Sequence, residues 1–359
     1  MEYKYWFANV KVITRGKKIR LIDRFKTAKA IYYIEETGLR SCGFLNDKEI
    51  KEFITCRKVA DIKEDYKEFE KKKIRLITYE MDEYPSKLKD ISTPPYALYV
   101  KGQLPDESKK SASIVGARDC TPYGETYALS FGKFFGENDI QVISGMARGV
   151  DSFGHRGALN GKGKTFAVLG CGVDICYPRE NIGLYTDILD NGGGIISEFP
   201  PGTNPLANNF PARNRIISAL SDIVLVMEAR EKSGSLITAD MALDQGKDVY
   251  ALPGPINSDL SAGCNRLIYQ GAGILLSRKQ LIEELDIIAT ELTEKTVKIE
   301  KCLENEEKLL YSRLTLYPKD ISALIEETGI NADIAVRTMV SLQIKGIVRE
   351  ITRNHYVRI

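Results

Sequence analysis

The chain contains no run of about 18 apolar residues, the length that a membrane-spanning helix needs, and its first ten residues lack the apolar core of a signal peptide. It has only two histidines, His155 and His355, so a histidine-based metal or catalytic site would have few ligands to draw on. The seven cysteines are an odd number and include no C-x-x-C pair, which is typical of reduced intracellular thiols. We therefore expect a cytoplasmic protein without a membrane segment, a metal site or a cofactor.

Charge is distributed unevenly along a chain whose net charge is only +2 at pH 7. Residues 1–75 carry 20 Lys and Arg against 12 Asp and Glu, a net charge of +8. Residues 76–282 carry 20 against 23, a net charge of −3, and residues 283–307 hold nine acids against three lysines. If the middle region binds a nucleic acid, it must use a local basic pocket, because its overall field is weakly repulsive.

The first 280 residues show two different sequence patterns. Apolar residues at helical spacing between Lys26 and Lys73 predict a small helical domain over residues 1–73. From Ser111 to Ser277, short β-branched runs alternate with helical stretches, which is typical of a largely parallel sheet covered on both faces. With two short strands before it, this stretch predicts an extended, Rossmann-like α/β domain over residues 74–280.

The remaining residues predict a linker and a third domain. Residues 281–308 are acidic and lack a strong apolar period, so we interpret them as a linker. Residues 309–359 show three helical stretches followed by two short strands, the order of a winged helix-turn-helix. The predicted recognition helix of this motif offers only Arg337 and Lys345 as basic groups. This low positive charge favours protein docking or dimerisation over sequence-specific DNA binding.

Glycine is concentrated where the predicted strands of the α/β domain end. The strands are predicted at Ser113–Val115, Ile140–Ile143, Phe166–Leu169, Gly194–Ser197, Ile223–Met227, Val249–Leu252 and Ile274–Leu276. Ligands of open α/β sheets bind in the crevice outside the carboxyl ends of the strands. The glycine loops therefore indicate a site at that edge.

The first two loops suit a phosphate. Gly116 lets backbone N–H groups approach closely, and Arg118 supplies a guanidinium fork, although a tight turn with a surface ion pair explains both residues equally well. In the second loop Gly145 and Gly149 are four residues apart, which does not fit the dinucleotide pattern G-x-G-x-x-G. The hydroxyl of Ser144 and the loop N–H groups indicate a phosphate instead.

Two further segments complete the candidate site. Phe210, Arg213, Asn214 and Arg215 offer a stacking face, charge and hydrogen bonds, a combination that suits single-stranded nucleic acid. The alternative is a buried phenylalanine with arginines paired to acids. Ser233-Gly234-Ser235 opens a helix after the fifth strand, where it can cap the helix or bind a phosphate.

No catalytic arrangement stands out. His155 lies on the predicted helix after the second loop, where a packed, hydrogen-bonded histidine is the more common case, and Asp151 is better explained as a loop or cap acid. Neither a Ser-His-Asp set nor a pair of carboxylates is suggested by the spacing. We therefore expect a protein that is not an enzyme.

Read in order, the loops resemble the DprA/Smf family of DNA-processing proteins. The motifs that carry the resemblance are Gly116-x-Arg118, Ser144-Gly145-x-Ala147-x-Gly149-x-Asp151, Phe210-Pro211-x-Arg213-Asn214-Arg215 and Ser233-Gly234-Ser235-Leu236-Ile237-Thr238. The resemblance implies a homodimer that binds single-stranded DNA without sequence preference and loads RecA recombinase during natural transformation. It implies DNA contacts at Gly116, Arg118, Ser144, Gly145, Arg148, Lys164, Phe210, Arg213, Asn214, Arg215, Ser233, Gly234 and Ser235.

Two features set limits on the resemblance. Some relatives have a basic residue where this chain has Ala207, so the pocket is expected to differ there. The domain also resembles the LOG-type phosphoribohydrolases, whose phosphate loop P-G-G-x-G-T-x-x-E, laid on this chain, puts Met241 in the place of the catalytic glutamate. A thioether cannot handle protons, so this enzyme, like a purely protein-binding adaptor, is the weaker alternative.

Overall fold

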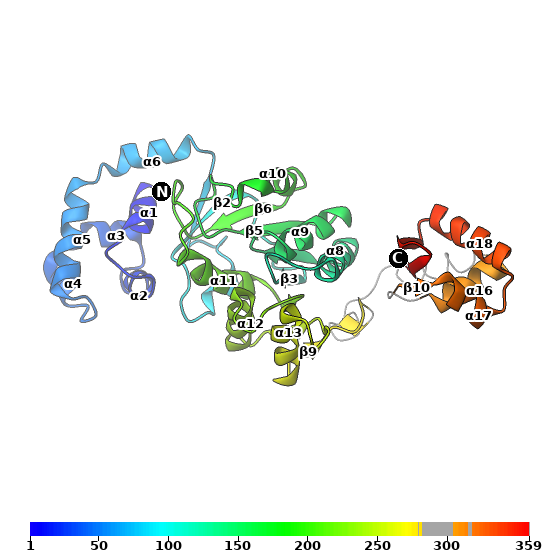
Figure 1. The fold of residues 1–359 in the computed structure, drawn as a ribbon. Helices are drawn as coiled ribbons and strands as arrows, with labels where there is room; N and C mark the ends of the chain where they lie inside the picture. Colours follow the sequence, from blue (N-terminus) through cyan, green and yellow to red (C-terminus); the bar gives the residue numbers. More distant parts are fainter. Residues whose placement is uncertain (279, 282–303, 315–317, 359) are drawn as a thin grey trace. The chain divides into compact units, whose positions relative to one another are not determined.

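The computed structural model describes residues 1–278, 280–281, 304–314 and 318–358 (Figure 1). The chain divides into two units, with the boundary between Ile287 and Ile288, and each is described by itself. Within the described residues, no helix combines the length and the apolar character needed to cross a membrane.

A nine-stranded sheet forms the centre of the first unit, in the order β1-β2-β6-β5-β4-β3-β7-β8-β9. Its strands are β1 (Arg75–Thr78), β2 (Ala97–Gly102), β3 (Ser111–Val115), β4 (Gln141–Ser144), β5 (Thr165–Val168), β6 (Gly194–Ser197), β7 (Ile223–Val226), β8 (Asp248–Ala251) and β9 (Gly273–Ile274). All pairs from β6 to β9 along the sheet are parallel, and β1 and β2 are added antiparallel at one edge. The Rossmann-like prediction is confirmed, and all seven predicted strands end within two residues of the observed ones.

The order of the strands creates a switch point at β3. The chain adds β4, β5 and β6 on one side of β3, and then returns to add β7, β8 and β9 on the other side. Loops that follow β3 and β7 therefore leave the sheet in opposite directions, and a crevice opens between them at the carboxyl ends of the strands. Every residue of β3, β4, β5, β6 and β7 is buried, as expected for parallel strands covered on both faces.

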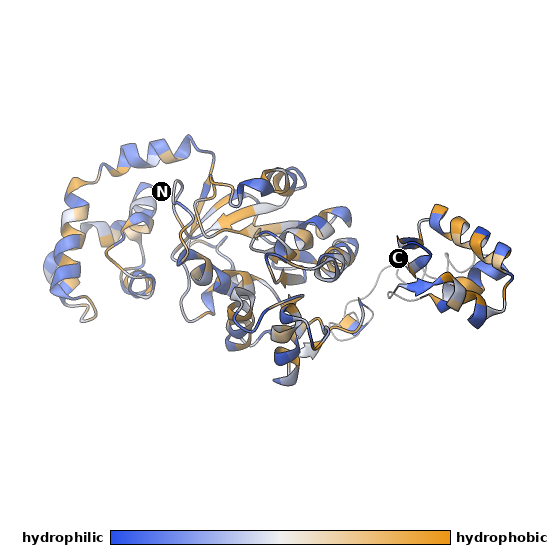
Figure 2. Cartoon of the chain, viewed as in Figure 1, coloured by the Kyte–Doolittle hydropathy of each residue, from blue (hydrophilic) through white to orange (hydrophobic). Residues whose placement is uncertain are grey.

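Helices cover both faces of this sheet (Figure 1). One group consists of α8 (Pro122–Glu137), α9 (Val150–Asn160) and α10 (Ile182–Asp190), and the other of α11 (Asn209–Leu220), α12 (Gly234–Asp244) and α13 (Asp259–Tyr269). The second group shares one apolar cluster with the central strands, to which Ile216, Ala239 and Leu267 contribute. Figure 2 shows the hydrophobic colour concentrated on the strands and on the inner sides of these helices.

Six helices precede the sheet, and they pack against it. They are α1 (Glu2–Asn9), α2 (Arg15–Phe25), α3 (Ala28–Tyr33), α4 (Glu36–Arg40), α5 (Asp47–Val59) and α6 (Ile62–Glu70), of which the sequence predicted only those after Lys26. Phe7 is fully buried, its ring centroid lies 4.8 Å from that of Tyr96, and both belong to an apolar cluster that includes Ile195 of β6. The predicted domain boundary at residue 73 is therefore a change of secondary structure inside one unit.

The second unit contains three helices and a small sheet. Its elements are α16 (Asn305–Arg313), β10 (Lys319–Asp320), α17 (Ile321–Thr328), α18 (Ala332–Ile344), β11 (Val348–Thr352) and β12 (His355–Arg358), and the strands pair in the order β10-β12-β11. Lys319–Asp320 forms a third strand, whereas the sequence predicted two strands in this region. Most of the predicted linker over 281–308 lies outside the described residues, but Asn305–Lys308 belongs to α16, so the linker was predicted four residues too long. The winged-helix assignment stays a prediction.

Candidate functional site

A crevice of about 690 Å³ lies at the switch point of the sheet. Its walls come from the loops after β3, β4, β5 and β7 and from the start of α11. Gly116, Arg118, Asn214, Ser233 and the two residues after Ser233 line it, as the sequence predicted. With Phe210 and Arg213, eight of the thirteen predicted contact residues thus come from three separate segments and meet at one place.

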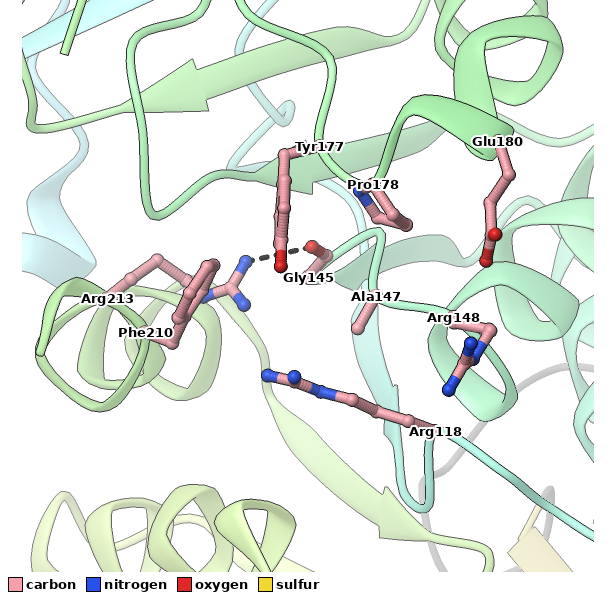
Figure 3. Close-up of a pocket in the computed structure, with 9 residues that line it drawn as sticks. All are labelled: Arg118, Gly145, Ala147, Arg148, Tyr177, Pro178, Glu180, Phe210 and Arg213. Carbon is pink, nitrogen blue, oxygen red and sulfur yellow. Dashed lines mark hydrogen bonds between the residues drawn. The ribbon is translucent and has the colours of Figure 1, made fainter. Parts of the chain in front are cut away.

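An aromatic wall borders a smaller pocket of about 170 Å³ in this crevice (Figure 3). The rings of Tyr177 and Phe210 are stacked, with centroids 5.5 Å apart and an interplanar angle of 29°. The guanidinium carbon of Arg118 lies 5.6 Å from the centroid of Phe210, within cation–π range. The three side chains therefore present a flat, positively charged face to a ligand. The sequence had identified Phe210 and Arg118 but not Tyr177, which follows β5 at a distance.

The opposite part of the crevice is the amino terminus of α12. Ser233 caps this helix, because its hydroxyl accepts the amide hydrogen of Ser235. The side-chain amide of Asn214 donates to the carbonyl of Gly234 at 3.2 Å, which ties α11 to the same turn. The remaining free N–H groups of a helix start favour an anion.

Two cations beside this turn were missed from the sequence. Arg230 and Lys232 line the crevice and are exposed, directly before the Ser-Gly-Ser turn. Together with Arg118 they form no ion pair with any residue that the structure describes, whereas Arg148 is paired with Asp119 at 2.6 Å. The run Arg230-Glu231-Lys232 was the available signal, because basic residues that flank a glycine turn can reach a phosphate held there.

Arg213 lines both the crevice and the smaller pocket, and it also holds the loop after β4 in place. Only 5% of its surface is exposed, and its guanidinium donates to the carbonyls of Gly145, at 2.9 Å, and Val168. Burial lowers the pKa of Arg213 to about 10, so the group stays cationic at neutral pH. Asp151 lies beneath the same loop, where its carboxylate accepts the amide hydrogen of Gly145 at 3.1 Å. Burial raises the pKa of Asp151, and the charge of Arg213 acts against that shift.

The loop after β4 requires glycine at position 145. A Cβ atom there would lie 2.6 Å from a guanidinium nitrogen of Arg213 and 2.7 Å from the carboxylate of Asp151. Both contacts are far closer than packed atoms allow, so the buried Arg213 and Asp151 fix the loop only because residue 145 has no side chain. Gly145 therefore acts through packing, and Arg148, which is exposed on the same loop, is the charged residue of this loop that lines the pocket.

Three predicted contacts do not belong to the crevice. Ser144 is fully buried, and its hydroxyl donates to the carbonyl of Ile114 at 2.6 Å. Arg215 is 7% exposed and forms an ion pair with Glu198 through two hydrogen bonds of 2.7 and 2.9 Å. Lys164 precedes β5 and so lies at the amino-terminal end of that parallel strand, the edge opposite to the crevice. Lys164 and Arg215 therefore do not cluster with Arg118, whereas Arg213 lines the crevice with it as predicted.

Catalytic and metal-binding groups are sparse in the described part of the chain. It contains no cluster of three His, Cys, Asp or Glu residues that could hold a metal ion. His155 is fully buried, its Nδ1 lies 2.6 Å from the hydroxyl of Thr165, and it does not line the crevice. Met241, on α12, takes the place at which the LOG-type enzymes have their glutamate.

These features define the first unit as an open α/β domain with a crevice at its switch point that is lined by cations, aromatic rings and a helix start. The family model of DNA recombination-mediator protein A matches residues 75–286, which include the whole sheet and every crevice residue. The chain therefore belongs to this family, and the resemblance to the DprA/Smf proteins is confirmed.

Individual relatives agree with this assignment. Protein Smf of Escherichia coli (strain K12) is 42% identical over 210 residues, which are 58% of this chain and 56% of that protein, so just over half of its length is matched. DNA processing protein DprA of Streptococcus pneumoniae is 41% identical over 207 residues, 57% of this chain and 72% of that protein. The X-ray structure of the S. pneumoniae protein covers 79% of this chain and 98% of its own, with a TM-score of 0.71 and 31% identity.

A further solved structure concerns the unique single-stranded-DNA binding mode of DNA processing protein A from Helicobacter pylori. It covers 59% of this chain and 95% of its own, with a TM-score of 0.53 and 30% identity.

Proposed function

We propose that the crevice binds single-stranded DNA, mainly through its backbone, without requiring a particular sequence. The observation that carries this proposal is a set of three exposed cations, Arg118, Arg230 and Lys232, that line the same crevice as the aromatic wall. None of the three has an ion pair with a described residue. They face one crevice in a region, residues 76–282, whose net charge is −3, so this region is expected to attract a polyanion at the crevice. The structure of the H. pylori relative, which concerns single-stranded-DNA binding, supports the same ligand.

The aromatic wall favours a single strand over a duplex. Bases of a single strand are free to stack on side-chain rings, whereas those of a duplex are already stacked and paired. Tyr177, about 40% exposed, offers such a ring, and Phe210 with Arg118 extends the surface. Stacking tolerates every base, because each has a π face, and so it adds affinity without selecting a sequence.

A fluorescence-anisotropy titration of oligothymidylate tests this proposal. Three neutralised phosphates on a single strand correspond to a slope of about −2 when log affinity is plotted against log salt. We expect Arg118→Ala to weaken binding by about tenfold, since it removes a charged contact and part of the stacking surface, and to flatten the slope by about 0.7. Duplex DNA of the same sequence is expected to bind more weakly than the single strand.

Lys164→Ala is the matched control for Arg118→Ala. Both variants remove one exposed positive charge, but Lys164 lies at the opposite edge of the sheet. If the two variants weaken binding equally, the protein attracts DNA by general charge and the crevice proposal fails.

We also propose that the protein is not an enzyme. A phosphoribohydrolase would need a carboxylate at position 241, where this chain has a half-buried methionine. Incubation with nucleoside monophosphates followed by chromatography is expected to yield no free base. Release of base that disappears in Ser233→Ala would contradict this proposal and establish the LOG-type activity instead.

Family membership supports three further proposals about partners and place. We propose that the protein acts as a homodimer in the cytoplasm and loads RecA recombinase onto single-stranded DNA during DNA uptake. The exposed side chains of Val336, Val340 and Ile344, spaced four residues apart on α18, favour protein contact over DNA contact for the second unit. Sedimentation velocity tests the dimer, and RecA ATP hydrolysis on strands coated with single-strand-binding protein tests the loading step.

A further inference from the structure

One side chain of the aromatic pocket does not suit a phosphate ligand. Glu180 lines the pocket with Tyr177, Phe210, Arg118 and Arg148, and it is exposed. A carboxylate accepts hydrogen bonds and donates none, so it repels a phosphate and attracts N–H groups. The part of the ligand that meets Glu180 must therefore present donors, and away from the ends of a DNA strand only the bases do.

The position of Glu180 is set by the loop beneath it. Glu180 lies in a short 3₁₀ helix, η1 (Arg179–Asn181). The side-chain amide of Asn181 donates to the carbonyl of Met146 at 2.9 Å and to the hydroxyl of Ser152 at 3.3 Å. These bonds connect η1 to the segment that carries Arg148, so the backbone of Glu180 keeps a fixed place relative to the pocket.

The carboxylate of Glu180 is available to a ligand. Arg148, the cation beside it in Figure 3, is already paired with Asp119 at 2.6 Å. In the part of the chain that the structure describes, no ion pair or hydrogen bond involves the Glu180 side chain. Figure 3 shows the rings of Tyr177 and Phe210 on one side of the pocket, and Glu180 with Arg148 on the other. A base that stacks on the rings would thus direct its hydrogen-bonding edge toward a free acceptor.

The chemistry of the four bases then selects one of them. On the Watson–Crick edge of guanine, N1–H and the N2 amino group are adjacent donors, which match the two oxygens of a carboxylate. Thymine has one donor between two acceptors, and adenine and cytosine each have one amino group beside a ring acceptor, so the second carboxylate oxygen would face an acceptor. Arg148 supplies donors of the kind that suit the O6 acceptor of guanine.

We infer that Glu180 gives the pocket a preference for guanine at one position of the bound strand. This inference rests on the proposed binding of single-stranded DNA and adds a base contact to it. Backbone and stacking contacts allow any sequence to bind, while a strand that brings a guanine into the pocket binds more tightly. A good bidentate contact to a base corresponds to about tenfold in affinity, and the open pocket places this one toward the lower end of the known range.

Competition titrations with three oligonucleotides test the inference. One is plain oligothymidylate, one carries guanine at every third position, and one carries hypoxanthine at the same positions. Guanines at regular spacing can reach the pocket wherever along the strand the protein binds. Because no two guanines are adjacent, the strand does not form quadruplexes. We expect the guanine strand to bind about tenfold more tightly than plain oligothymidylate. The hypoxanthine strand should lose most of this gain, because it lacks only the N2 amino group.

Glu180→Gln should remove the guanine preference while binding to plain oligothymidylate persists, because the amide replaces one acceptor by a donor. Glu231→Gln is the matched control, since Glu231 is an exposed acid near the crevice that does not line it, and this variant should keep the preference. Equal affinity of the wild type for all three strands, or an unchanged preference in Glu180→Gln, would overturn the inference and leave the proposed function intact. Absence of binding to plain oligothymidylate at low salt would overturn both.

Discussion

At the scale of single residues, His155 carries an acid-sensitive part of the stability. It is fully buried, and burial together with the charge of Arg213 lowers its pKa to about 3. The hydroxyl of Thr165 donates to the carbonyl of Val142 at 2.8 Å, so its oxygen accepts from His155 Nδ1–H, and Nε2 has no hydrogen-bond partner among the described residues. The folded protein therefore holds a neutral imidazole with no group placed to accept a proton from Nε2.

This arrangement predicts a specific loss of stability in acid. Above pH 6.5 the histidine is neutral in both states, and below it the unfolded chain binds a proton that the folded protein excludes until about pH 3. The free energy of unfolding should therefore fall by about 2 kcal/mol more between pH 7 and pH 4.5 in the wild type than in His155→Gln. Urea titrations followed by the fluorescence of Trp6 measure the difference. The control is His355→Gln, at a partly exposed position, which should keep the wild-type pH slope. A wild-type pH slope retained in His155→Gln would contradict the buried neutral state.

The same scale shows what the sequence could predict of the site and what it could not. Loop motifs identified Arg118, Phe210 and the Ser233 turn, because glycines and caps have local signatures. The motifs could not show that Arg118 is exposed whereas Arg213 and Arg215 are buried. The burial of the latter two depends on contacts with Gly145 and Glu198, which form only in the folded chain. Tyr177 was missed for the same reason: its stacking partner Phe210 lies 33 positions away.

At the scale of elements, α8 and α9 are held in contact by glycines. A Cβ atom at Gly157 would lie 2.4 Å from the carbonyl of Leu129, and one at Gly132 would lie 2.4 Å from that of Gly154. The helix backbones therefore touch, and this contact fixes the start of α9, which carries Asp151 and the loop above it. The sequence revealed the glycines at strand ends, whereas those inside the two helices have no local signature, because they serve a neighbouring helix.

Gly157→Ala tests this close contact. The added methyl group must separate two backbones, so we expect the variant to lose about 1–3 kcal/mol of unfolding free energy. Gly183→Ala is the matched control on α10, where the nearest atom to a Cβ is the mobile end of Arg156 at 3.5 Å. That variant should be as stable as the wild type or slightly more stable, because alanine favours a helix over glycine. If the two variants change the unfolding free energy equally in urea titrations, helix propensity and not the contact between α8 and α9 determines the effect of Gly157→Ala.

At the scale of the whole molecule, the helical segment before residue 73 is part of the first unit, called here the sheet unit because the nine-stranded sheet forms its centre. Besides the packing of Phe7 on Tyr96, Arg15 of α2 donates to Glu198 at 2.7 Å, and the same carboxylate is held by Arg215 of α11. The change of sequence pattern near residue 73 suggested a separate domain. A helical and an α/β pattern differ in the sequence whether or not the two segments share a core. The basic surplus of residues 1–75 is thereby attached to the unit that contains the crevice.

This packing predicts that the chain unfolds in two steps, one for each unit. The amino-terminal helices should unfold together with the nine-stranded sheet of the first unit. Trp6 is the only tryptophan and lies in α1, so its fluorescence reports on these helices, while circular dichroism reports on the whole chain. Phe7→Ala empties a fully buried site at a cost of about 3–5 kcal/mol, and it should lower the Tm of the sheet unit together with the Trp6 transition. Leu342→Ala, at an equally buried site of the second unit, should leave the Trp6 transition unchanged. A Trp6 transition that shifts alone in Phe7→Ala, with the sheet still folded at that temperature, would show that residues 1–73 form a domain of their own after all.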